Sequence, residues 1–269
     1  MRTTVQYMLI HVGEQDGEQG GEQRDEAQHG PAGPTEDRRP GAEVSTELAD
    51  WLEEATEQRV NLQGSRLRPI GEATTVRARG GEVLVTDGPF VETKEQVGGY
   101  DLLECGSLDE AVGWARRHPT VTGGGAIEVR PLRVPGEVPN CGPLPPLAVG
   151  AMRYLFMVTA DEGVQLTEEE SARVGPATDA WVAEMNGRGV RLCGNQLERV
   201  DQARTVRSTG GHVLVTDGPF AETKEQIAGF DVIDCADLDE AIEVASKHPV
   251  TSFGIGAIEV RPFWVWDES

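Results

Sequence analysis

The residues best suited to acid–base chemistry lie in a motif that the chain contains twice, VLVTDGPFVETKEQ at residues 83–96 and VLVTDGPFAETKEQ at residues 213–226. Among 24 basic side chains only three are lysines, and Lys94 and Lys224 occupy the same place in the two motifs. An ammonium group beside carboxylates makes an acid–base site or a binding site for a polar ligand. The candidate catalytic residues of the motifs are Asp87, Lys94, Asp217 and Lys224, and the candidate ligand-binding residues are Glu92 and Glu222.

A structural interpretation of this motif stays open. An aspartate before Gly-Pro can hydrogen-bond its own backbone and fix a turn. Phe90 and Phe220 are expected to fill the core, and a recent duplication alone would preserve the lysines.

Two further pairs of residues occupy equivalent positions in the two copies. His118 and His248 stand at a predicted helix end before proline, where the helix dipole favours a cationic histidine. The alternative is a proton donor or acceptor at the edge of a cleft, which makes both candidate catalytic residues. Arg130 and Arg261 lie on the predicted last strand of each copy. They either pair with acidic residues of a neighbouring strand or bind an anionic ligand.

No cofactor or metal site is predicted. Cys105 and Cys235 match each other on a strand and are expected to be buried, Cys193 aligns with Gln63, and Cys141 lies in a proline-rich segment. None of these cysteines has CxxC spacing, and no His/Cys cluster suggests zinc. The sequence also contains no phosphate-binding P-loop, dinucleotide fingerprint or GxSxG motif.

The chain is a duplication. From Trp51/Trp181 to Pro119/Pro249 the two copies align at a constant offset of 130, and 23 of the 37 residues from 83 to 119 are identical in the second copy. The predicted units are residues 1–132 and 151–269, joined by a proline-rich linker at 133–150. Residues 13–44 form an acidic insert with few large apolar side chains, and we expect it to be disordered.

Each copy predicts the same elements. A short strand is followed by a helix near Thr46–Gln58 or Glu168–Asn186, an extended segment, and two strands joined by Gly-Gly, which is typical of a hairpin. A further strand, a helix that ends before proline and a last strand complete a split βαβ pattern. One face of such a sheet lacks a cover, so we expect two sheets packed face to face within the chain. The predicted fold class is α+β.

Composition excludes several classes of protein. The formal net charge is −22, which disfavours binding to nucleic acid or to an anionic membrane. No apolar run is long enough to span a bilayer, and the N-terminus does not resemble a signal peptide, so a cytoplasmic protein is expected.

The repeated VLVTDGPFxETKEQ sequence resembles the YCII-related family in its DGPF branch. The resemblance covers roughly residues 1–132 and 151–263. It implies two tandem ferredoxin-like units that form an intrachain dimeric α/β barrel. It also implies a His–Asp pair on the two helices. Here the first helix has no histidine in either copy, and the residue before proline is His118 or His248 rather than Asp.

Two functions follow as hypotheses. The first is binding or conversion of a small polar metabolite in a cleft beside the DGPF loop. The second is a non-catalytic regulatory module, because the resemblance implies association with extracytoplasmic-function sigma factors. The negative charge would attract a basic DNA-binding partner of this kind. The chain is expected to be a pseudo-dimer by itself, and further homo-oligomerisation stays open.

Overall fold

The computed structural model describes residues 4–14, 44–91, 95–133, 141–161, 164, 166–221 and 225–264. The first unit contains β1 (Val5–Glu14), α1 (Thr46–Glu57), β2 (Asn61–Arg66), β3 (Thr74–Arg79), β4 (Glu82–Asp87), β5 (Glu95–Cys105), α2 (Leu108–Arg117), α3 (Pro119–Thr122) and β6 (Ala126–Arg133). The second contains β7 (Met152–Asp161), α4 (Glu168–Gly187), β8 (Arg191–Leu197), β9 (Arg204–Thr209), β10 (His212–Asp217), β11 (Glu225–Cys235), α5 (Leu238–Lys247), α6 (Pro249–Ser252) and β12 (Ala257–Pro262). Most of the expected acidic insert lies outside the described residues, and the unit boundaries proposed above stay predictions.

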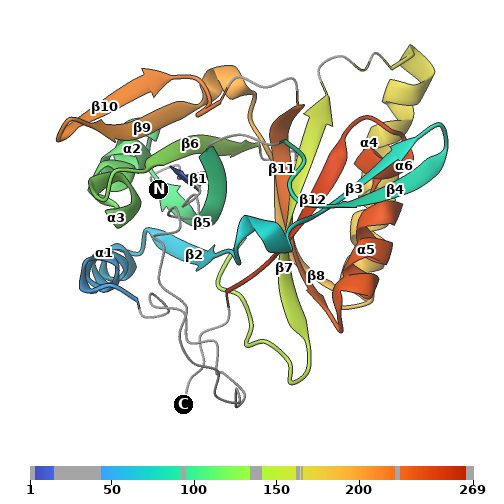
Figure 1. The fold of residues 1–269 in the computed structure, drawn as a ribbon, viewed down its shortest axis with the longest axis horizontal. Helices are drawn as coiled ribbons and strands as arrows, with labels where there is room; N and C mark the ends of the chain where they lie inside the picture. Colours follow the sequence, from blue (N-terminus) through green and yellow to red (C-terminus); the bar gives the residue numbers. More distant parts are fainter. Residues whose placement is uncertain are drawn as a thin grey trace, which may run out of the picture.

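Eight strands form a barrel from the two units. The first unit contributes the order β2-β5-β1-β6 and the second the order β8-β11-β7-β12 (Figure 1). Strands β6 and β8 join the two halves through the pair Leu132–Leu197, and a bridge between Leu67 and Phe263 joins them at the opposite seam. The predicted α+β fold, two tandem ferredoxin-like units in an intrachain α/β barrel, is confirmed.

Alternation along the strands separates the barrel core from the helix-covered faces. Met8, Ile10 and Leu102 point into the barrel, where they pack with Leu155 and Phe230 of the second unit. The intervening residues of β1 and β5 face the helices instead. A fully buried side chain of this kind stabilises the fold by about 1.5–3 kcal/mol. The two units therefore share one apolar interior.

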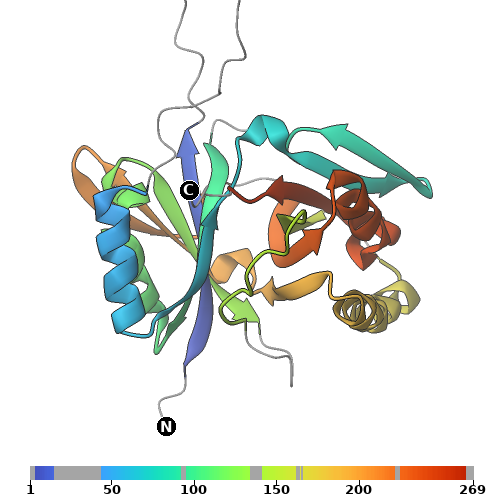
Figure 2. The same ribbon diagram turned by 90° about the horizontal axis from the view of Figure 1, so that it is seen from below.

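The helices cover the outer faces of the barrel, with α1 on one side and α4 and α5 on the other (Figure 2). Trp51 and Trp181 anchor α1 and α4 in equivalent ways, because each indole N–H donates to a backbone oxygen of the neighbouring helix. Pro119 and Pro249 follow the ends of α2 and α5 as predicted, and each also begins a short, unpredicted helix, α3 or α6.

The β3–β4 and β9–β10 hairpins are exchanged between the units. Strand β3 pairs with β12 of the second unit, and β9 pairs with β6 of the first (Figure 1). The turn glycines Gly80 and Gly81 have φ of 62° and 84°, which confirms the predicted Gly-Gly hairpin. The exchange itself was not predicted, because a hairpin motif does not specify the strand beside which it packs.

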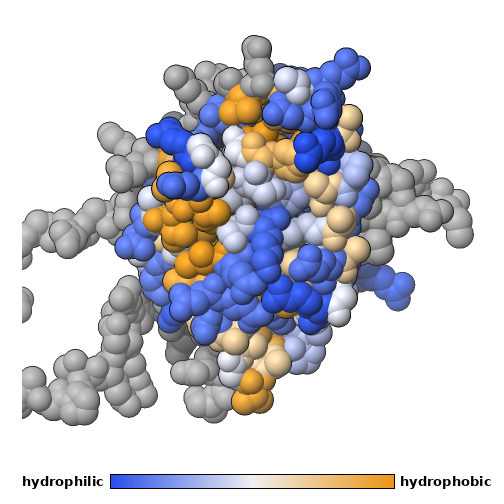
Figure 3. Space-filling model, turned by 90° about the vertical axis from the view of Figure 1, so that its right-hand side faces the viewer, coloured by the Kyte–Doolittle hydropathy of each residue, from blue (hydrophilic) through white to orange (hydrophobic). Residues whose placement is uncertain are grey.

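The exchanged hairpins expose apolar side chains at the ends of the sheet. Val83, Leu84 and Val85 of β4 are 48%, 40% and 45% exposed, and Leu214 of β10 is 51% exposed. On the face that carries the β3–β4 hairpin, hydrophobic patches alternate with hydrophilic ones (Figure 3). Within the described segments, no helix combines the length and apolar character that crossing a membrane requires.

Candidate functional site

The DGPF motifs build turns. Gly88 and Gly218 have φ of 96° and 95°, a backbone conformation that favours glycine. Asp87 and Asp217 are exposed at the ends of β4 and β10, and Asp217 lies 3.0 Å from the Arg204 guanidinium. Four further predicted site residues lie outside the described part of the chain: Glu92, Lys94, Glu222 and Lys224.

Arg130 and Arg261 are buried in ion pairs with glutamates of their own strands, Glu128 and Glu259, rather than with those of a neighbouring strand. The second oxygen of Glu128 accepts the Phe220 N–H at 3.0 Å, and that of Glu259 accepts the Phe90 N–H at 3.0 Å. Each ion pair therefore holds the DGPF loop of the other unit.

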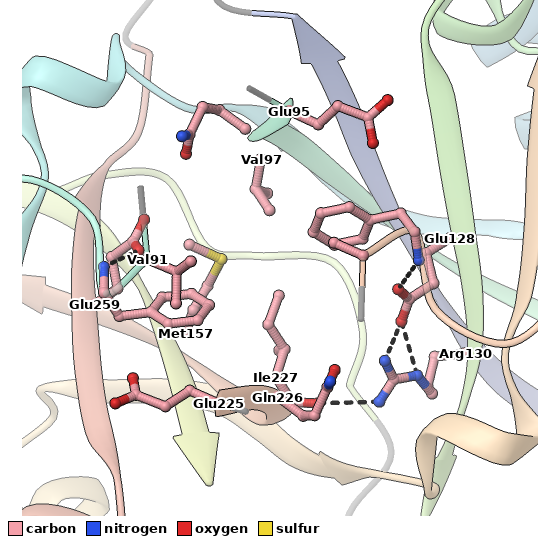
Figure 4. Close-up of a pocket in the computed structure, with 14 residues that line it drawn as sticks. Val91, Glu95, Val97, Glu128, Arg130, Met157, Glu225, Gln226, Ile227 and Glu259 are labelled. Carbon is pink, nitrogen blue, oxygen red and sulfur yellow. Dashed lines mark hydrogen bonds and ion pairs between the residues drawn. The ribbon is translucent and has the colours of Figure 1, made fainter. Parts of the chain in front are cut away.

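A small cavity lies between the two DGPF loops and is lined by equivalent residues of the two units (Figure 4). Phe90, Val97, Phe220 and Ile227 contribute apolar walls to it, and its four carboxylates come from Glu95, Glu128, Glu225 and Glu259. Each of these carboxylates has an arginine partner, and Glu95 and Glu225 pair with arginines of the exchanged hairpins. The cavity volume is about 30 Å³, which suits water rather than a metabolite.

A different cluster forms on the helix-covered face of the first unit, between β1, β5 and α3. His11 Nε2 lies 2.8 Å from Asp101 Oδ2, and His118 Nε2 lies 3.5 Å from the same oxygen. Among the described residues, none of these three buried atoms has a well-aligned hydrogen-bond partner. The cluster therefore presents three converging polar atoms whose hydrogen-bonding capacity is not satisfied internally.

The protonation of His118 is set by its backbone neighbour. The Thr120 N–H donates to His118 Nδ1 at 3.0 Å, so the neutral ring must carry its proton on Nε2, facing Asp101. Burial, with a smaller contribution from His11, lowers the pKa of His118 to about 3. The cationic interpretation of His118 is therefore wrong, since the imidazole accepts at Nδ1 and is neutral at pH 7.

The same hydrogen bond argues against a metal ion in this cluster. Two histidines and an aspartate with donor atoms within 4.8 Å of one another have the composition of a metal site. A metal bound to His118 Nε2 would use the lone pair of that nitrogen, so the proton of the neutral ring would move to Nδ1. Two N–H groups, those of Nδ1 and Thr120, would then point at each other. Metal-bound histidines normally donate from the second nitrogen instead.

The second unit keeps the aspartate and one histidine but replaces the rest. Val158 stands in the place of His11, and Arg191 binds Asp231 with a 2.6 Å hydrogen bond. His248 Nε2 lies 3.8 Å from Asp231, and burial lowers the pKa of His248 to about 3, so this histidine is also neutral. The fold therefore forms without the His11–Asp101 pair, and only the first unit contains it.

Glycine makes room for the aspartate in both units. A Cβ at Gly64 would lie 2.0 Å from Asp101 Oδ1 and 2.9 Å from the Tyr100 carbonyl oxygen. We expect Gly64→Ala to destabilise the protein by about 1–3 kcal/mol in urea unfolding, as overpacking typically does. Gly71→Ala is the control, because its Cβ would meet no atom within 4 Å. Equal costs for the two variants would contradict this interpretation.

Sequence reasoning missed His11 and Asp101. His11 has no histidine counterpart in the second copy, so the repetition does not single it out. A usable signal was present in β5 and β11, where an aspartate recurs within two apolar stretches, YDLL at residues 100–103 and FDVI at residues 230–233. An acidic residue on the helix-covered face of a central strand requires a partner.

The fold and this cluster define a single-chain α/β barrel of two ferredoxin-like units with a His–Asp–His cluster in the first. The YCII-related domain matches residues 7–134 and 152–267, so the chain belongs to the YCII-related family.

The chain is also similar to two individual proteins. An uncharacterized protein of Rhizobium meliloti (strain 1021) is 48% identical over 82 residues, which represent 28% of this chain and 64% of that protein. A crystal structure described as “Putative Chlorite dismutase” is 9% identical, with a TM-score of 0.45 over 98% of this chain and 96% of that one.

Proposed function

We propose that the protein binds or converts a small polar metabolite at the His11–Asp101 pair of the first unit. In this proposal His11 accepts or donates a proton, and the Asp101 carboxylate, 2.8 Å from it, stabilises the imidazolium that forms. His118 turns its Nε2–H toward the same carboxylate oxygen at 3.5 Å, without a well-aligned hydrogen bond. The Asp101 carboxylate would then support His11, and His11 would exchange a proton with the substrate, as general acid–base catalysis requires.

The observation that carries this proposal is the difference between the two units. An element needed only for folding would be expected in both, yet the second unit has valine in place of the first histidine. The His11 side chain is 14% exposed, so a small molecule could approach it from the surface, whereas Asp101 and His118 are buried behind it.

The test is turnover, or exchange of substrate hydrogen with solvent, followed by NMR in D₂O with a panel of small carbonyl compounds and carboxylates. We expect His11→Val to lower the rate at least about 100-fold, because positioned acid–base groups contribute that much. His11→Val should fold normally, since the second unit contains valine there. Asp101→Asn tests the partner carboxylate, and the exposed His212→Val is the control. Full activity in His11→Val would refute the proposal.

The motif-centred version of this function stays a prediction. It places the polar groups of the site at Asp87, Lys94, Asp217 and Lys224, beside the DGPF loops. The Lys94→Met, Lys224→Met double variant separates the two sites: loss of turnover there with His11→Val unaffected would favour the DGPF loops.

The regulatory alternative is favoured by the net charge of −22, which would attract a basic sigma factor. Co-purification of the full chain with an extracytoplasmic-function sigma factor, weakened by salt, would support it. No association at low ionic strength would contradict it.

A further inference from the structure

Two cysteines that are distant in sequence come together between the linker and the second unit. Cys141 lies in the linker and Cys193 in β8. The Gln63 side-chain amide bridges the two segments. Its nitrogen donates to the carbonyl oxygen of Gly142, the residue after Cys141, at 2.9 Å and to Cys193 Sγ at 3.2 Å. Among the described residues all four cysteines are free thiols.

The position of Cys141 is fixed by its backbone. The Gln6 side chain donates to the Cys141 carbonyl oxygen at 2.8 Å and accepts the Cys141 N–H at 3.2 Å. The Cys141 residue is 3% exposed and belongs to the barrel-core cluster, against which Cys193 packs. The two cysteines are therefore held in one neighbourhood by this packing and by the Gln63 bridge.

The two thiols differ in chemical character. The neighbouring Cys141 side chain lowers the pKa of Cys193 despite burial, and the Gln63 N–H and the Arg191 guanidinium contribute in the same direction. The Cys193 side chain and burial raise the pKa of Cys141. Cys193 is only partly buried, so it is the more reactive and more accessible of the two, as expected of an attacking thiolate.

We propose that Cys141 and Cys193 form a reversible disulfide when the protein meets a peroxide. The Cys193 thiolate attacks a peroxide oxygen, the O–O bond breaks, and the leaving hydroxide takes a proton to become water. The Cys141 sulfur, giving up its proton, then attacks the resulting Cys193 sulfenic acid. The S–S bond forms, the S–O bond breaks, and a second water leaves. Two thiols are oxidised by two electrons, and the peroxide is reduced.

The disulfide would tie the linker to β8. Since the residues it joins are 52 positions apart, it would restrict the unfolded chain and raise the melting temperature by roughly 5 °C or more. Exchange with a dithiol would reverse the reaction. This inference is independent of the proposed function, because neither cysteine belongs to the His11–Asp101–His118 cluster.

The other two cysteines are internal controls. Burial raises the pKa of Cys105 and of Cys235 to about 12, so both stay protonated and unreactive. The full chain is treated with hydrogen peroxide and digested without reduction, and the peptides are identified by mass spectrometry. We expect a cross-linked pair of peptides containing Cys141 and Cys193, which dithiothreitol separates, together with the rise in melting temperature.

Variants make the test decisive. Cys193→Ser should abolish the cross-link, Cys141→Ser should leave a Cys193 sulfenic acid that a dimedone probe traps, and Cys105→Ser should behave as the parent. Cross-links to Cys105 or Cys235, or a folded protein whose Cys141 and Cys193 both stay reduced, would overturn the proposal. A sulfenic acid on Cys141 in place of Cys193 would overturn the assignment of the attacking thiol.

Discussion

Acidification from pH 7 to pH 4.5 is expected to destabilise the protein because His118 and His248 are buried as neutral rings. Burial lowers the pKa of each to about 3, whereas the unfolded chain protonates histidine near 6.5. Below pH 6.5 the unfolded state therefore binds more protons than the folded state, and the free energy of unfolding falls as the pH falls. Each histidine should contribute roughly 2–3 kcal/mol to this loss over that range.

Buried carboxyl groups oppose this trend. Burial raises the pKa of Asp231 to about 6 and also raises that of Glu259, so the folded state takes up these protons before the unfolded chain does. The histidine contribution is isolated by comparing urea unfolding of the parent with a His118→Gln, His248→Gln variant between pH 7 and pH 4.5. The variant should lose less stability on acidification, whatever its stability at pH 7. The exposed His212→Gln is the control, and an unchanged pH slope in the double variant would contradict the prediction.

Arg261→Met should destabilise the protein by about 3–5 kcal/mol, the typical cost of leaving a buried charge without its partner. Arg261 and Glu259 are each 1% exposed, and the guanidinium also donates to the Val97 and Arg68 carbonyl oxygens at 2.9 and 2.8 Å. Without Arg261, the Glu259 carboxylate keeps the Phe90 N–H but loses the positive charge beside it. Urea unfolding at pH 7 measures the change.

Two controls define the origin of this loss. Arg199→Met removes an arginine whose side chain is 81% exposed, and it should change stability by less than about 0.5 kcal/mol. The Glu259→Leu, Arg261→Met double variant should lose less than Arg261→Met alone, because no buried charge remains. A double variant that is less stable than the single one would contradict the ion-pair explanation.

Much of the fold could be predicted from the sequence because local signals were strong. The constant offset of 130 marked the duplication, the Gly-Gly pairs marked the hairpins, and proline marked the ends of α2 and α5. The exchange of hairpins depends instead on which strand edge each hairpin meets. That choice is made by contacts such as Arg77 with Glu225 across the two units, and no local pattern encodes it.

The candidate site was harder to predict, because repetition drew attention to residues that the two units share. The shared Asp87 and Asp217 are exposed, and the shared Arg130 and Arg261 hold the DGPF loops. The His11–Asp101 pair forms instead between one shared residue and one that differs. Asp101 lies beside His11 only because β1 and β5 are adjacent and both side chains face the helices.

The reciprocal hairpins also bear on how the two halves could diverge. Two separate chains with this interlocked architecture would assemble in a concentration-dependent step, and any substitution would enter both partners at once. A covalent connection makes assembly unimolecular, so stability becomes independent of dilution. It also lets each half mutate alone: one half could lose a histidine and acquire an arginine while the other kept its polar cluster, and the barrel would still close.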